Sequence, residues 1–581
     1  MNTAIDQYEL ETTWSNRATD EIVQKSIEGE IPIDIELSLR CVLQETNPGK
    51  LTDSVVFIKV FSLILANKAG KPIQAIATQL GFVVGIDSAV EAFEWGLTFI
   101  KSCQNSGLYT LVKKEAEWYV VPSFSFDKQT LRKLEELQFL PPMQILPNPW
   151  ASNYGGGWVW EKKHLVLGSR FTKHDMPLAY DVINTMQEIA WEIDPATYLL
   201  EKQTNHGLNK KKFLRVIYKY IGKAFHFVWQ YDSRGRSYSS GYHLNIQSNE
   251  YGKALLSFHD KEVITNPDNL AISIANHAGM DNLTWEERIA WTRSQDLNDP
   301  NIEWDQPMLG RKALRAAQDT LEGKPTGYLM SIDATSSGLQ IMAVLSGCKK
   351  TAELVNCVDS TVRQDVYTTV AHLMNDELPQ PVARKTTKQA AMTHYYNSKA
   401  TPKALFSETE LRVFYEVLDG LLPGAEAIME LINACWSTNK DYHAWTLPDG
   451  HVAYVPVIEG INAEYLDDDF GEIPIRYYTQ TPSQNYRSLC PNIMHSIDGY
   501  VAREMIRRCS FQLIHVHDCF FFNPNYLQDV ANTYKIILAE IARSDLLQDI
   551  LRQITGDNSI RITKFSSDLD KDILQSSYML S

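Results

Sequence analysis

The apolar pattern between Gly327 and Gly347 predicts a buried strand, a turn and a helix. The segment reads GYLMSIDATSSGLQIMAVLSG. An apolar run leads to Asp333, small residues follow, and apolar residues at helical spacing begin near Gly338. The Asp333 carboxylate is therefore expected at the C-terminal end of a strand, beside a turn that a ligand can approach closely. A structural alternative is that Asp333 caps the next helix, a common role for aspartate before a serine-rich turn.

A second apolar run, FQLIHVHDCFFFNP, predicts a tight hairpin with Asp518 at its turn and buried residues on both sides. An unpaired charge in such surroundings is costly. A carboxylate there stays ionised if a metal or another cation lies on it. The alternative is a core aspartate that is hydrogen-bonded to His517 or to backbone amides.

Between these two segments, ARKTTKQAAMTHYYNSKA predicts a helix with an unusual face. Arg384, Lys388, Met392 and Tyr396 are four residues apart, so they lie on one side of a helix. That face presents two cations, then a thioether and a phenol, an order that suits a triphosphate followed by a sugar and a base. Taken alone, the segment also fits an ordinary solvated helix face.

The first part of the chain is predicted to be a small, mainly helical domain over residues 1–148. Amphipathic segments lie around 51–68 and 86–103, and AEWYVVPSFSF, near 116–126, is typical of a strand. The tripeptide DIE, from Asp34 to Glu36, could begin an exonuclease metal site, but a lone D-x-E pattern has little specificity.

The loop LPNPWASNYGGGWVW, rich in proline and then glycine, marks the boundary after this domain. A helix is predicted at about 178–198, within a linker region that spans 149–230. From YDSRGRSY onward, over 231–581, the pattern is that of a mixed α/β body.

Composition places the chain among soluble globular proteins. It has 581 residues, of which 44% are hydrophobic, and eight cysteines that form no C-x-x-C pair. The longest apolar stretch, from Val55, is interrupted by Lys59 and is too short to span a bilayer. The start of the chain has neither the charge order of a signal peptide nor the arginine content of a transit peptide. We therefore expect a cytoplasmic protein without membrane contact.

Net charge taken alone disfavours a nucleic acid partner. Lys and Arg number 55 against 71 Asp and Glu, which gives −16, and a uniformly acidic surface repels a polyanion. Residues 202–223 are an exception, because they carry seven cations against one acid at their edge, Glu201. This run, which includes Lys211 and Lys212, is either a solvated helix face or a nucleic acid contact.

Asp333, Asp518 and the basic helix between them are together the minimum parts of a two-metal phosphoryl transfer site. Mg²⁺ prefers one or two carboxylates together with substrate phosphates. Two such ions activate an attacking hydroxyl and stabilise the leaving oxygen, while cationic side chains neutralise the transferring phosphates.

The same segments resemble the motifs of the single-subunit, phage-type DNA-dependent RNA polymerases, a family that includes mitochondrial enzymes. DATSSGLQ is similar to that family's first palm motif, D-x-S/T-x-S-G-I/L-Q. RKTTKQAAMTHYYNS is similar to the fingers motif R-x3-K-x7-Y-G-S, and HVHDCF to the second palm motif, H-D-S-F. YDSRGRSY, LNIQSNEYGKALL, TLPDG, PNIMHSIDG and the tail DILQSSYML match further segments in order, from about residue 149 to 581.

The resemblance implies a right-hand polymerase with palm and fingers in 231–581 and a reduced thumb in 149–230. It implies that Asp333 and Asp518 bind two Mg²⁺ ions. Arg384 and Lys388 would contact the triphosphate, and Lys388 would help the pyrophosphate leave. The remaining implied substrate contacts are Met392, Tyr396 and His495, of which Tyr396 and His495 would sense the ribose 2′-hydroxyl. The implied nucleic acid contacts are Arg234, Arg236, Lys253, Lys211 and Lys212.

Several departures from the family pattern bear on how a template is engaged. Asn397 replaces the usual glycine after the tyrosine, and Cys519 replaces the serine after the metal aspartate. The thumb region is short, and the segment between TLPDG and PNIMHSIDG leaves little room for a long promoter-reading hairpin. We therefore expect a single-stranded or premelted DNA template, or an accessory promoter-recognition protein.

The implied function is RNA synthesis from ribonucleoside triphosphates on a DNA template, giving nascent RNA in an infected host cell, with virion packaging left open. One alternative is a related DNA polymerase of family A type, but such enzymes carry an acid after the first metal aspartate, and ATSSG has none. The other alternative, a catalytically dead scaffold that only binds nucleic acid, disagrees with the retention of the charged motif residues.

Overall fold

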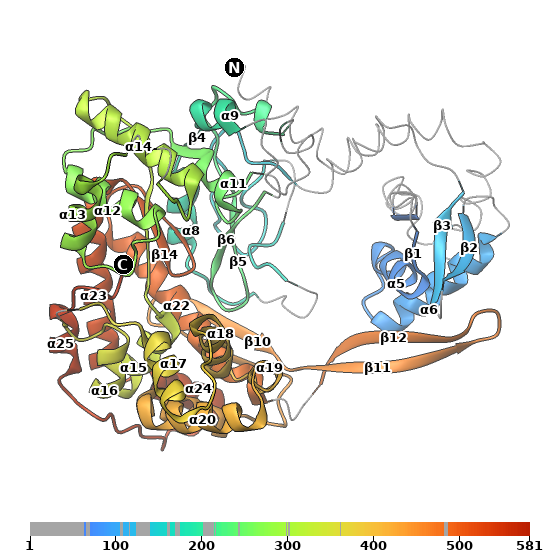
Figure 1. Ribbon diagram of the computed structural model, residues 1–581. Coiled ribbons are helices and arrows are strands. Elements are labelled where there is room, and N and C mark those ends of the chain that lie inside the picture. The colour runs from blue at the N-terminus through green and yellow to red at the C-terminus, as the bar shows by residue number, and fades with distance from the viewer. Residues whose placement is uncertain are drawn as a thin grey trace. The chain divides into compact units, whose positions relative to one another are not determined.

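The computed structural model describes residues 63–64, 70–104, 109–114, 117–123, 140–159, 163–168, 175–201, 214, 216–241, 244–297, 299, 302–360, 362–481 and 486–581. The chain forms two compact units (Figure 1). The smaller unit comprises 1–141, 158–161 and 458–482, and the larger unit comprises 142–157, 162–457 and 483–581. The DIE tripeptide at Asp34, most of the predicted helix at 51–68, and both Lys211 and Lys212 lie outside the described residues.

The smaller unit combines a helix pair, a three-stranded sheet and a long hairpin. Its elements are α5 (Ile73–Val83), α6 (Ala89–Ser102), β1 (Lys71–Pro72), β2 (Tyr109–Lys114), β3 (Glu117–Pro122), β11 (Ile458–Asp467) and β12 (Gly471–Gln480). The sheet is antiparallel in the order β1-β3-β2. The helices cross closely because small residues meet there: a Cβ on Gly96 would lie 2.0 Å from the Ala77 carbonyl oxygen.

The β11–β12 hairpin corrects the expectation that this segment is too brief for a long hairpin. Each strand has ten residues, paired from Ile458 with Gln480 to Asp467 with Gly471. Phe470 and Ile473, at the tip, are buried in the same core as α5 and α6. The Trp118 indole donates to the Phe470 carbonyl at 3.0 Å. Alternating polar and apolar residues let the hairpin form, and burial of its tip in the smaller unit stabilises it.

The described residues of the larger unit form one three-stranded sheet and three two-stranded sheets. The first, in the order β13-β14-β8, is antiparallel throughout. Its strands are β8 (Met330–Asp333), β13 (Leu513–Val516) and β14 (Cys519–Phe522). The paired strands of the other sheets are β4 (Trp191–Ile193) with β7 (Leu256–Phe258), β5 (Trp229–Tyr231) with β6 (Ser237–Ser239), and β9 (Tyr442–Thr446) with β10 (Val452–Pro456).

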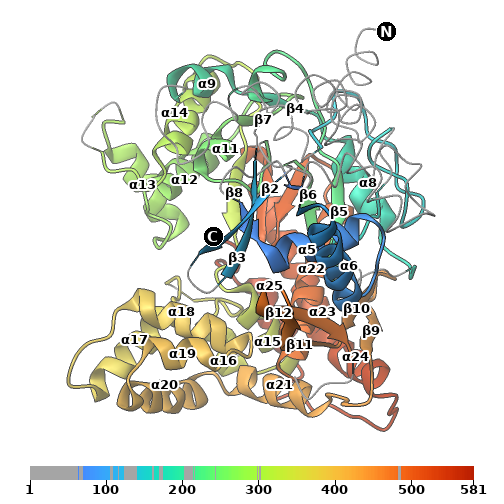
Figure 2. The same cartoon turned by 90° about the vertical axis from the view of Figure 1, so that its right-hand side faces the viewer.

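Helices surround these strands on several sides (Figure 2). They are α8 (Tyr180–Glu188), α9 (Pro195–Glu201), α11 (Glu250–Ala254), α12 (Pro267–His277), α13 (Trp285–Ser294), α14 (Pro307–Leu321), α15 (Ser337–Ser346), α16 (Lys349–Leu354), α17 (Val366–Glu377), α18 (Arg384–Tyr395), α19 (Ala400–Leu405), α20 (Glu408–Leu421), α21 (Pro423–Ala434), α22 (Leu489–Arg508), α23 (Leu527–Arg543), α24 (Leu546–Thr555) and α25 (Leu569–Gln575). Short 3₁₀ turns lie at Tyr486–Ser488 and Pro524–Tyr526. Helices α15, α22 and α23 pack on one another, and α22 also contacts β13.

The predicted helix at 178–198 is wrong in its second half. Helix α8 ends at Glu188, and Trp191 to Ile193 form β4, paired with β7. Trp191 and Ile193 are buried by this pairing. Pro195, which has no N–H to donate, then begins the separate helix α9. Burial in a sheet therefore overrides the helical spacing of this segment.

The predicted elements around Asp333, Arg384 and Asp518 are confirmed. Strand β8 and helix α15 bracket the turn after Asp333, α18 begins at Arg384, and β13 and β14 form a hairpin around Asp518. The architecture is mixed, with helices and strands in both units. Within the described part of the chain, we find no helix whose length and hydropathy would let it cross a bilayer.

Candidate active site

The β-sheet brings Asp333 and Asp518 together. Asp333 ends β8 and is paired with Cys519, the residue that follows Asp518 at the hairpin turn. The Ala334 amide donates to the backbone carbonyl of Asp518 at 3.2 Å. Surrounding protein atoms displace water from Asp333 and raise the pKa of its carboxyl, and the negative charge of Asp518 adds to the rise. Two carboxylates thus lie close enough to disfavour their joint ionisation, as in a site built for a cation.

The structure shows whether Asp333 caps the next helix or is available to a ligand. Helix α15 begins at Ser337, and the residue before it is Ser336, so Asp333 is not the cap. Instead, Asp333 lines three cavities, of about 330, 510 and 140 Å³, and residues of α18 line the last two. Asp518 also lines the smallest of them. Both predicted metal carboxylates therefore reach one pocket.

Helix α18 presents its predicted face to the two carboxylates. Lys388, Met392 and Tyr396 line the 140 Å³ cavity together with Asp333 and Asp518. Arg384 and Lys388 line the 510 Å³ cavity, which Asp333 also borders. Arg384 and Lys388 lie in the first half of α18, and Tyr396 follows its C-terminal end. No one cavity takes all four residues: Arg384 lines only the 510 Å³ cavity, Met392 and Tyr396 line only the 140 Å³ cavity, and Lys388 lines both.

Arg384 is held by a neighbouring carboxylate. Its guanidinium pairs with Asp365 at 2.5 Å, and the same carboxylate accepts the backbone amides of Tyr367 and Thr368 at the start of α17. These contacts lower the pKa of Asp365 against the opposing effect of its burial. Asp365 therefore joins the N-terminus of α17 to that of α18.

His495 and Tyr396 lie side by side from different elements. His495 belongs to α22 and Tyr396 follows α18, and their ring centroids are 4.9 Å apart. Burial lowers the pKa of His495 to about 2, and the positive charges of Arg236 and Arg234 act in the same direction. The imidazole is therefore neutral at physiological pH.

The two arginines of YDSRGRSY have partners inside the protein. Arg234 pairs with Asp232 at 2.7 Å and contacts His495, and Arg236 pairs with Asp498 at 2.7 Å. Burial raises the pKa of Asp498 to about 6 although Arg236 opposes the rise. The predicted contact of these arginines with a template stays a prediction.

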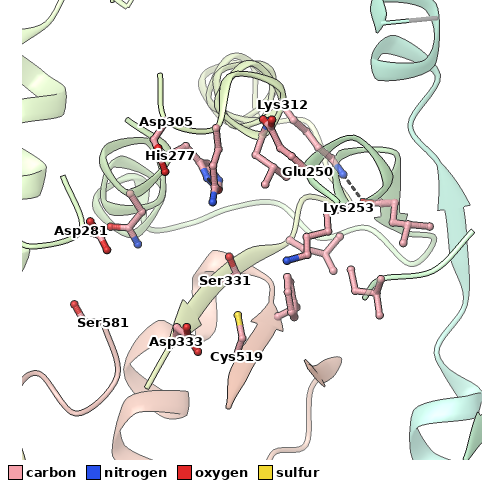
Figure 3. A pocket seen from close by; sticks show the side chains of 17 residues that line it. Glu250, Lys253, His277, Asp281, Asp305, Lys312, Ser331, Asp333, Cys519 and Ser581 are labelled. Atoms are coloured by element: carbon pink, nitrogen blue, oxygen red, sulfur yellow. Dashed lines mark hydrogen bonds between the residues drawn. The ribbon is translucent and has the colours of Figure 1, made fainter. Parts of the chain in front are cut away.

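Lys253 borders a cavity of about 330 Å³ that shares the lining residues Asp281, Asp333 and Ser581 with the 510 Å³ cavity (Figure 3). It extends from α11 toward the Phe521 ring, 5.9 Å away, and Asp333 and Cys519 lie on the neighbouring strands. Buried His277 lines the same cavity and has a pKa lowered to about 4 by its burial.

Asp365, Asp498 and Arg363 belong to the site and were not foreseen from sequence. Asp498, on α22, neutralises Arg236, and Arg363 lines the 510 Å³ cavity with Arg384 and Lys388. Burial lowers the pKa of Arg363, and the nearby charge of Arg384 acts in the same direction. Arg363 lies in the irregular segment before α17, where the spacing of residues does not predict which side chains face a cavity. Asp498 is three residues after His495 on α22, so helical spacing predicts that the two side chains lie near each other.

The two departures from the family pattern have local explanations. Asn397 has a φ of +65°, a left-handed conformation that favours glycine and that asparagine tolerates better than other residues. Its side-chain amide donates to Asn433 at 2.7 Å, which adds a contact that glycine lacks. Cys519 is paired with Asp333 in the sheet, and its burial raises the thiol pKa.

Comparison with known proteins agrees with these features. The DNA-dependent RNA polymerase family matches residues 265–414, a span that includes Asp333 and α18. The chain is 24% identical to the DNA-directed RNA polymerase of Pseudomonas phage phiKMV, over 61% of this chain and 61% of that enzyme. It is 24% identical to the mitochondrial enzyme of Schizosaccharomyces pombe over 63% of this chain and 38% of that enzyme. The match to DNA-directed RNA polymerase 1 of Arabidopsis thaliana, also mitochondrial, is 23% identical and covers 57% and 41%.

The chain thus spans less than two thirds of the length of these relatives. The carboxylate pair on the β13-β14-β8 sheet, faced by a cationic helix, thus lies in a chain that is similar to DNA-dependent RNA polymerases, and the family match itself includes Asp333 and α18. Within that class, the relatives to which this chain is similar are phage and mitochondrial enzymes.

Proposed function

We propose that the protein is a DNA-dependent RNA polymerase that transfers ribonucleotides to the 3′-end of a growing RNA under the direction of a DNA template. The observation that carries this proposal is the approach of Asp333 and Asp518 to one pocket, beside the Lys388–Tyr396 face of α18. The family relationship supports it.

In this proposal the larger unit supplies the palm and fingers of a right-hand polymerase. The palm comprises the β13-β14-β8 sheet with α15, α22 and α23, and the fingers comprise α17 to α21. Residues 149–230 would form a reduced thumb, and residues 1–148 a small N-terminal domain.

Asp333 and Asp518 would hold two Mg²⁺ ions. The described residues contain no cluster of three or more metal-binding side chains, which fits Mg²⁺, because this ion takes one or two carboxylates and completes its shell with water and substrate phosphates. The raised pKa of Asp333 also fits, since a cation would offset the repulsion between the carboxylates. When bound, the ions would activate the RNA 3′-hydroxyl and stabilise the leaving oxygen.

The other side chains would bind and orient the nucleotide. Arg384 and Lys388 would neutralise the triphosphate, and Arg363, in the same 510 Å³ cavity, would add a third cation. Met392 and Tyr396 would pack near the sugar and base, with His495 beside Tyr396. Lys253 would contact the nucleic acid, and so would Lys211 and Lys212, which lie outside the described residues.

The β11–β12 hairpin supports the need for a partner or a premelted template. Its described residues include six acids, Glu459, Glu464, Asp467, Asp468, Asp469 and Glu472, against the single cation Arg476. Lys101 of α6 pairs with Asp467 and Asp469, and the balance of this surface stays acidic. Acidic strands repel DNA phosphates and are poorly suited to binding a duplex. We therefore propose that an accessory protein, or single-stranded DNA, brings the enzyme to its start site in the infected cell.

The test is extension of an RNA primer on a single-stranded DNA template with ribonucleotides and Mg²⁺, beside run-off synthesis on duplex DNA. Asp333→Asn and Asp518→Asn should each abolish extension and leave the thermal unfolding of the protein similar. Asp376→Asn, an exposed carboxylate change on α17, is the matched control and should extend normally. Template-directed extension by either active-site variant at the control rate would refute the proposal.

A further inference from the structure

The turn that carries Arg234 holds its guanidinium in one orientation. Both oxygens of Asp232 are used: Oδ1 accepts the backbone amides of Arg234 and Arg236 at 2.9 and 3.1 Å, and Oδ2 accepts Arg234 Nε and Nη2 at 3.0 and 2.7 Å. The Tyr238 hydroxyl donates to the same Oδ2 at 3.2 Å. A two-pronged contact of this kind fixes the plane of a guanidinium.

Neighbouring side chains pack closely against this turn at Gly235. This glycine has a φ of +91°, and a Cβ there would lie 2.7 Å from both Arg503 and His451. Arg503 Nη1 also donates to the Gly235 carbonyl at 2.6 Å. The backbone on which Arg234 stands is therefore held from outside as well as by Asp232.

The remaining nitrogen of Arg234 meets His495. Nη1 lies 2.7 Å from His495 Nδ1. A guanidinium can only donate, so Nδ1 must be the acceptor, and the proton of the neutral ring must be on Nε2. The Nε2–H group of His495, on the opposite side of the ring from Arg234, can then donate a hydrogen bond.

With its proton on Nε2, His495 can recognise a ligand oxygen that accepts a hydrogen bond. The His495 ring lies against Tyr396, which lines the pocket shared by Asp333 and Asp518. On the proposed function, the acceptor that distinguishes the substrates is the ribose 2′-hydroxyl, which a deoxyribonucleotide lacks.

We propose that Arg234 is a positioning residue, which fixes His495 as its Nε2–H tautomer and so contributes to the selection of ribonucleotides, instead of holding the template backbone. Its charge is already paired with Asp232, which leaves little attraction for a phosphate. The inference rests on the proposed function, because it assigns part of the nucleotide selection of the same site.

The test compares Arg234→Gln, Arg234→Lys, His495→Ala and the double variant Arg234→Gln with His495→Ala. Each protein is assayed for kcat/KM with a ribonucleotide and with its deoxy counterpart. Arg234→Gln should lower the ribo/deoxy ratio by about 2- to 12-fold, the effect of one hydrogen bond. Arg234→Lys, which keeps the charge but loses the fork, should lower it similarly. The double variant should lose no more selectivity than His495→Ala alone, because Arg234 acts through His495.

A second measurement separates positioning from phosphate binding. A side chain that holds one phosphate contributes about 0.7–0.9 to the slope of log K against log salt. We expect the slope of template binding to be the same for Arg234→Gln as for the unaltered enzyme and for Arg412→Gln, an exposed change on α20.

Three results would overturn the inference: an unchanged ribo/deoxy ratio in the Arg234 variants, selectivity losses that add in the double variant, or a salt slope reduced by about one in Arg234→Gln. Failure of the unaltered enzyme to extend RNA with ribonucleotides would instead refute the proposed function. The two failures are therefore distinguishable in one set of assays.

Discussion

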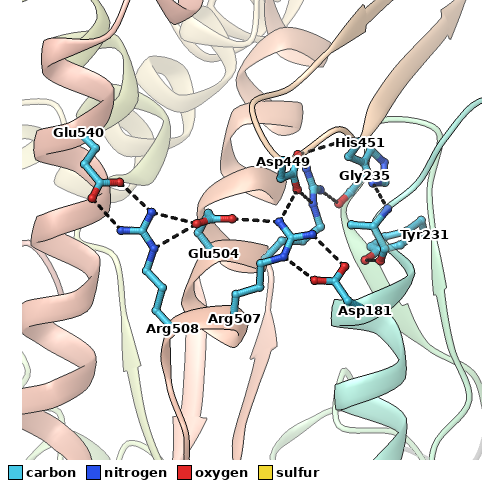
Figure 4. Close-up of polar contacts among 11 residues, drawn as sticks. Asp181, Tyr231, Gly235, Asp449, His451, Glu504, Arg507, Arg508 and Glu540 are labelled. Carbon is cyan, nitrogen blue, oxygen red and sulfur yellow. Dashed lines mark hydrogen bonds and ion pairs between the residues drawn. The ribbon is translucent and has the colours of Figure 1, made fainter.

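The buried ion pair between Asp449 and Arg503 gives the sharpest prediction about stability. Figure 4 labels Asp449 together with Arg507 and Asp181, which belong to the same network. Both side chains are fully buried, with contacts of 2.5 Å from Nε to Oδ2 and 3.3 Å from Nη2 to Oδ1. Arg507 adds a contact to Asp449 at 3.3 Å, but it also pairs with Asp181 at the surface. Asp449→Asn keeps the shape of the side chain and removes the charge, so Arg503 is left in the interior without a compensating anion.

The expected loss is large for a change of so few atoms. Removing one partner of a buried pair typically costs about 3–5 kcal/mol, since the other charge stays desolvated. Because the asparagine oxygen can still accept one hydrogen bond, we expect a value near the lower end, about 3 kcal/mol. With a urea slope of about 3 kcal/mol per M, the unfolding midpoint should fall by about 1 M.

The assay is equilibrium urea unfolding followed by tryptophan fluorescence. The matched control is Glu416→Gln, which breaks the exposed pair of Arg412 and Glu416 on α20. An exposed pair is worth less than about 1 kcal/mol, so the control should unfold almost like the unaltered protein. Replacing both buried partners, as Asp449→Leu with Arg503→Met, should cost less than the sum of the single changes.

Equal midpoints for Asp449→Asn and Glu416→Gln would refute the reasoning, because a buried and an exposed charge would then be equivalent. A double variant whose cost equals the sum would also refute it. The network matters for the site as well as for stability, since Arg503 also holds the carbonyl of Gly235 in the turn before Arg236.

Three further predictions concern the site and its surroundings. Tyr396→Phe should keep extension but lower the ribo/deoxy ratio of kcat/KM by about tenfold, since it removes one hydroxyl beside His495. Arg363→Gln should raise the KM for nucleotides and for pyrophosphate in the reverse reaction by about tenfold, as expected for a lost hydrogen bond to a charged phosphate. His277 has a pKa lowered to about 4 by burial, against 6.5 when exposed. The unfolded chain therefore binds a proton that the folded chain does not, and stability falls as the pH drops from 6.5 toward 4, by up to about 1.4 kcal/mol per unit. His277→Gln should flatten this dependence in urea unfolding at pH 7.5 and pH 5.

Each of these has a clear contrary result. An unaltered ribo/deoxy ratio would remove Tyr396 from nucleotide selection. An unaltered KM for pyrophosphate would place Arg363 away from the phosphates. If the pH dependence of unfolding is the same in His277→Gln and in the unaltered protein, other groups carry it.

The sequence by itself determined the local parts of the site. The strand before Asp333, the helix from Arg384 to Tyr395 and the hairpin around Asp518 all follow from spacing and turn residues, and the structure has all three. Such features are readable because the period of apolar residues reports which face of a strand or helix is buried. The family motifs added the roles that we propose for these residues.

Only the tertiary structure decided which distant residues meet. Strand β14 pairs with β8, and this pairing, between segments far apart in the chain, places Asp518 beside Asp333. The ion-pair partners of Arg236 and Arg503, and the His495 ring that Arg234 contacts, are likewise remote in sequence. Periodicity carries no record of such pairings, because they depend on how whole elements pack and on where a buried charge finds its compensation. For the same reason, the segment around Trp191 became a strand despite its helical spacing, and residues 458–480 became a hairpin whose tip is buried in the smaller unit.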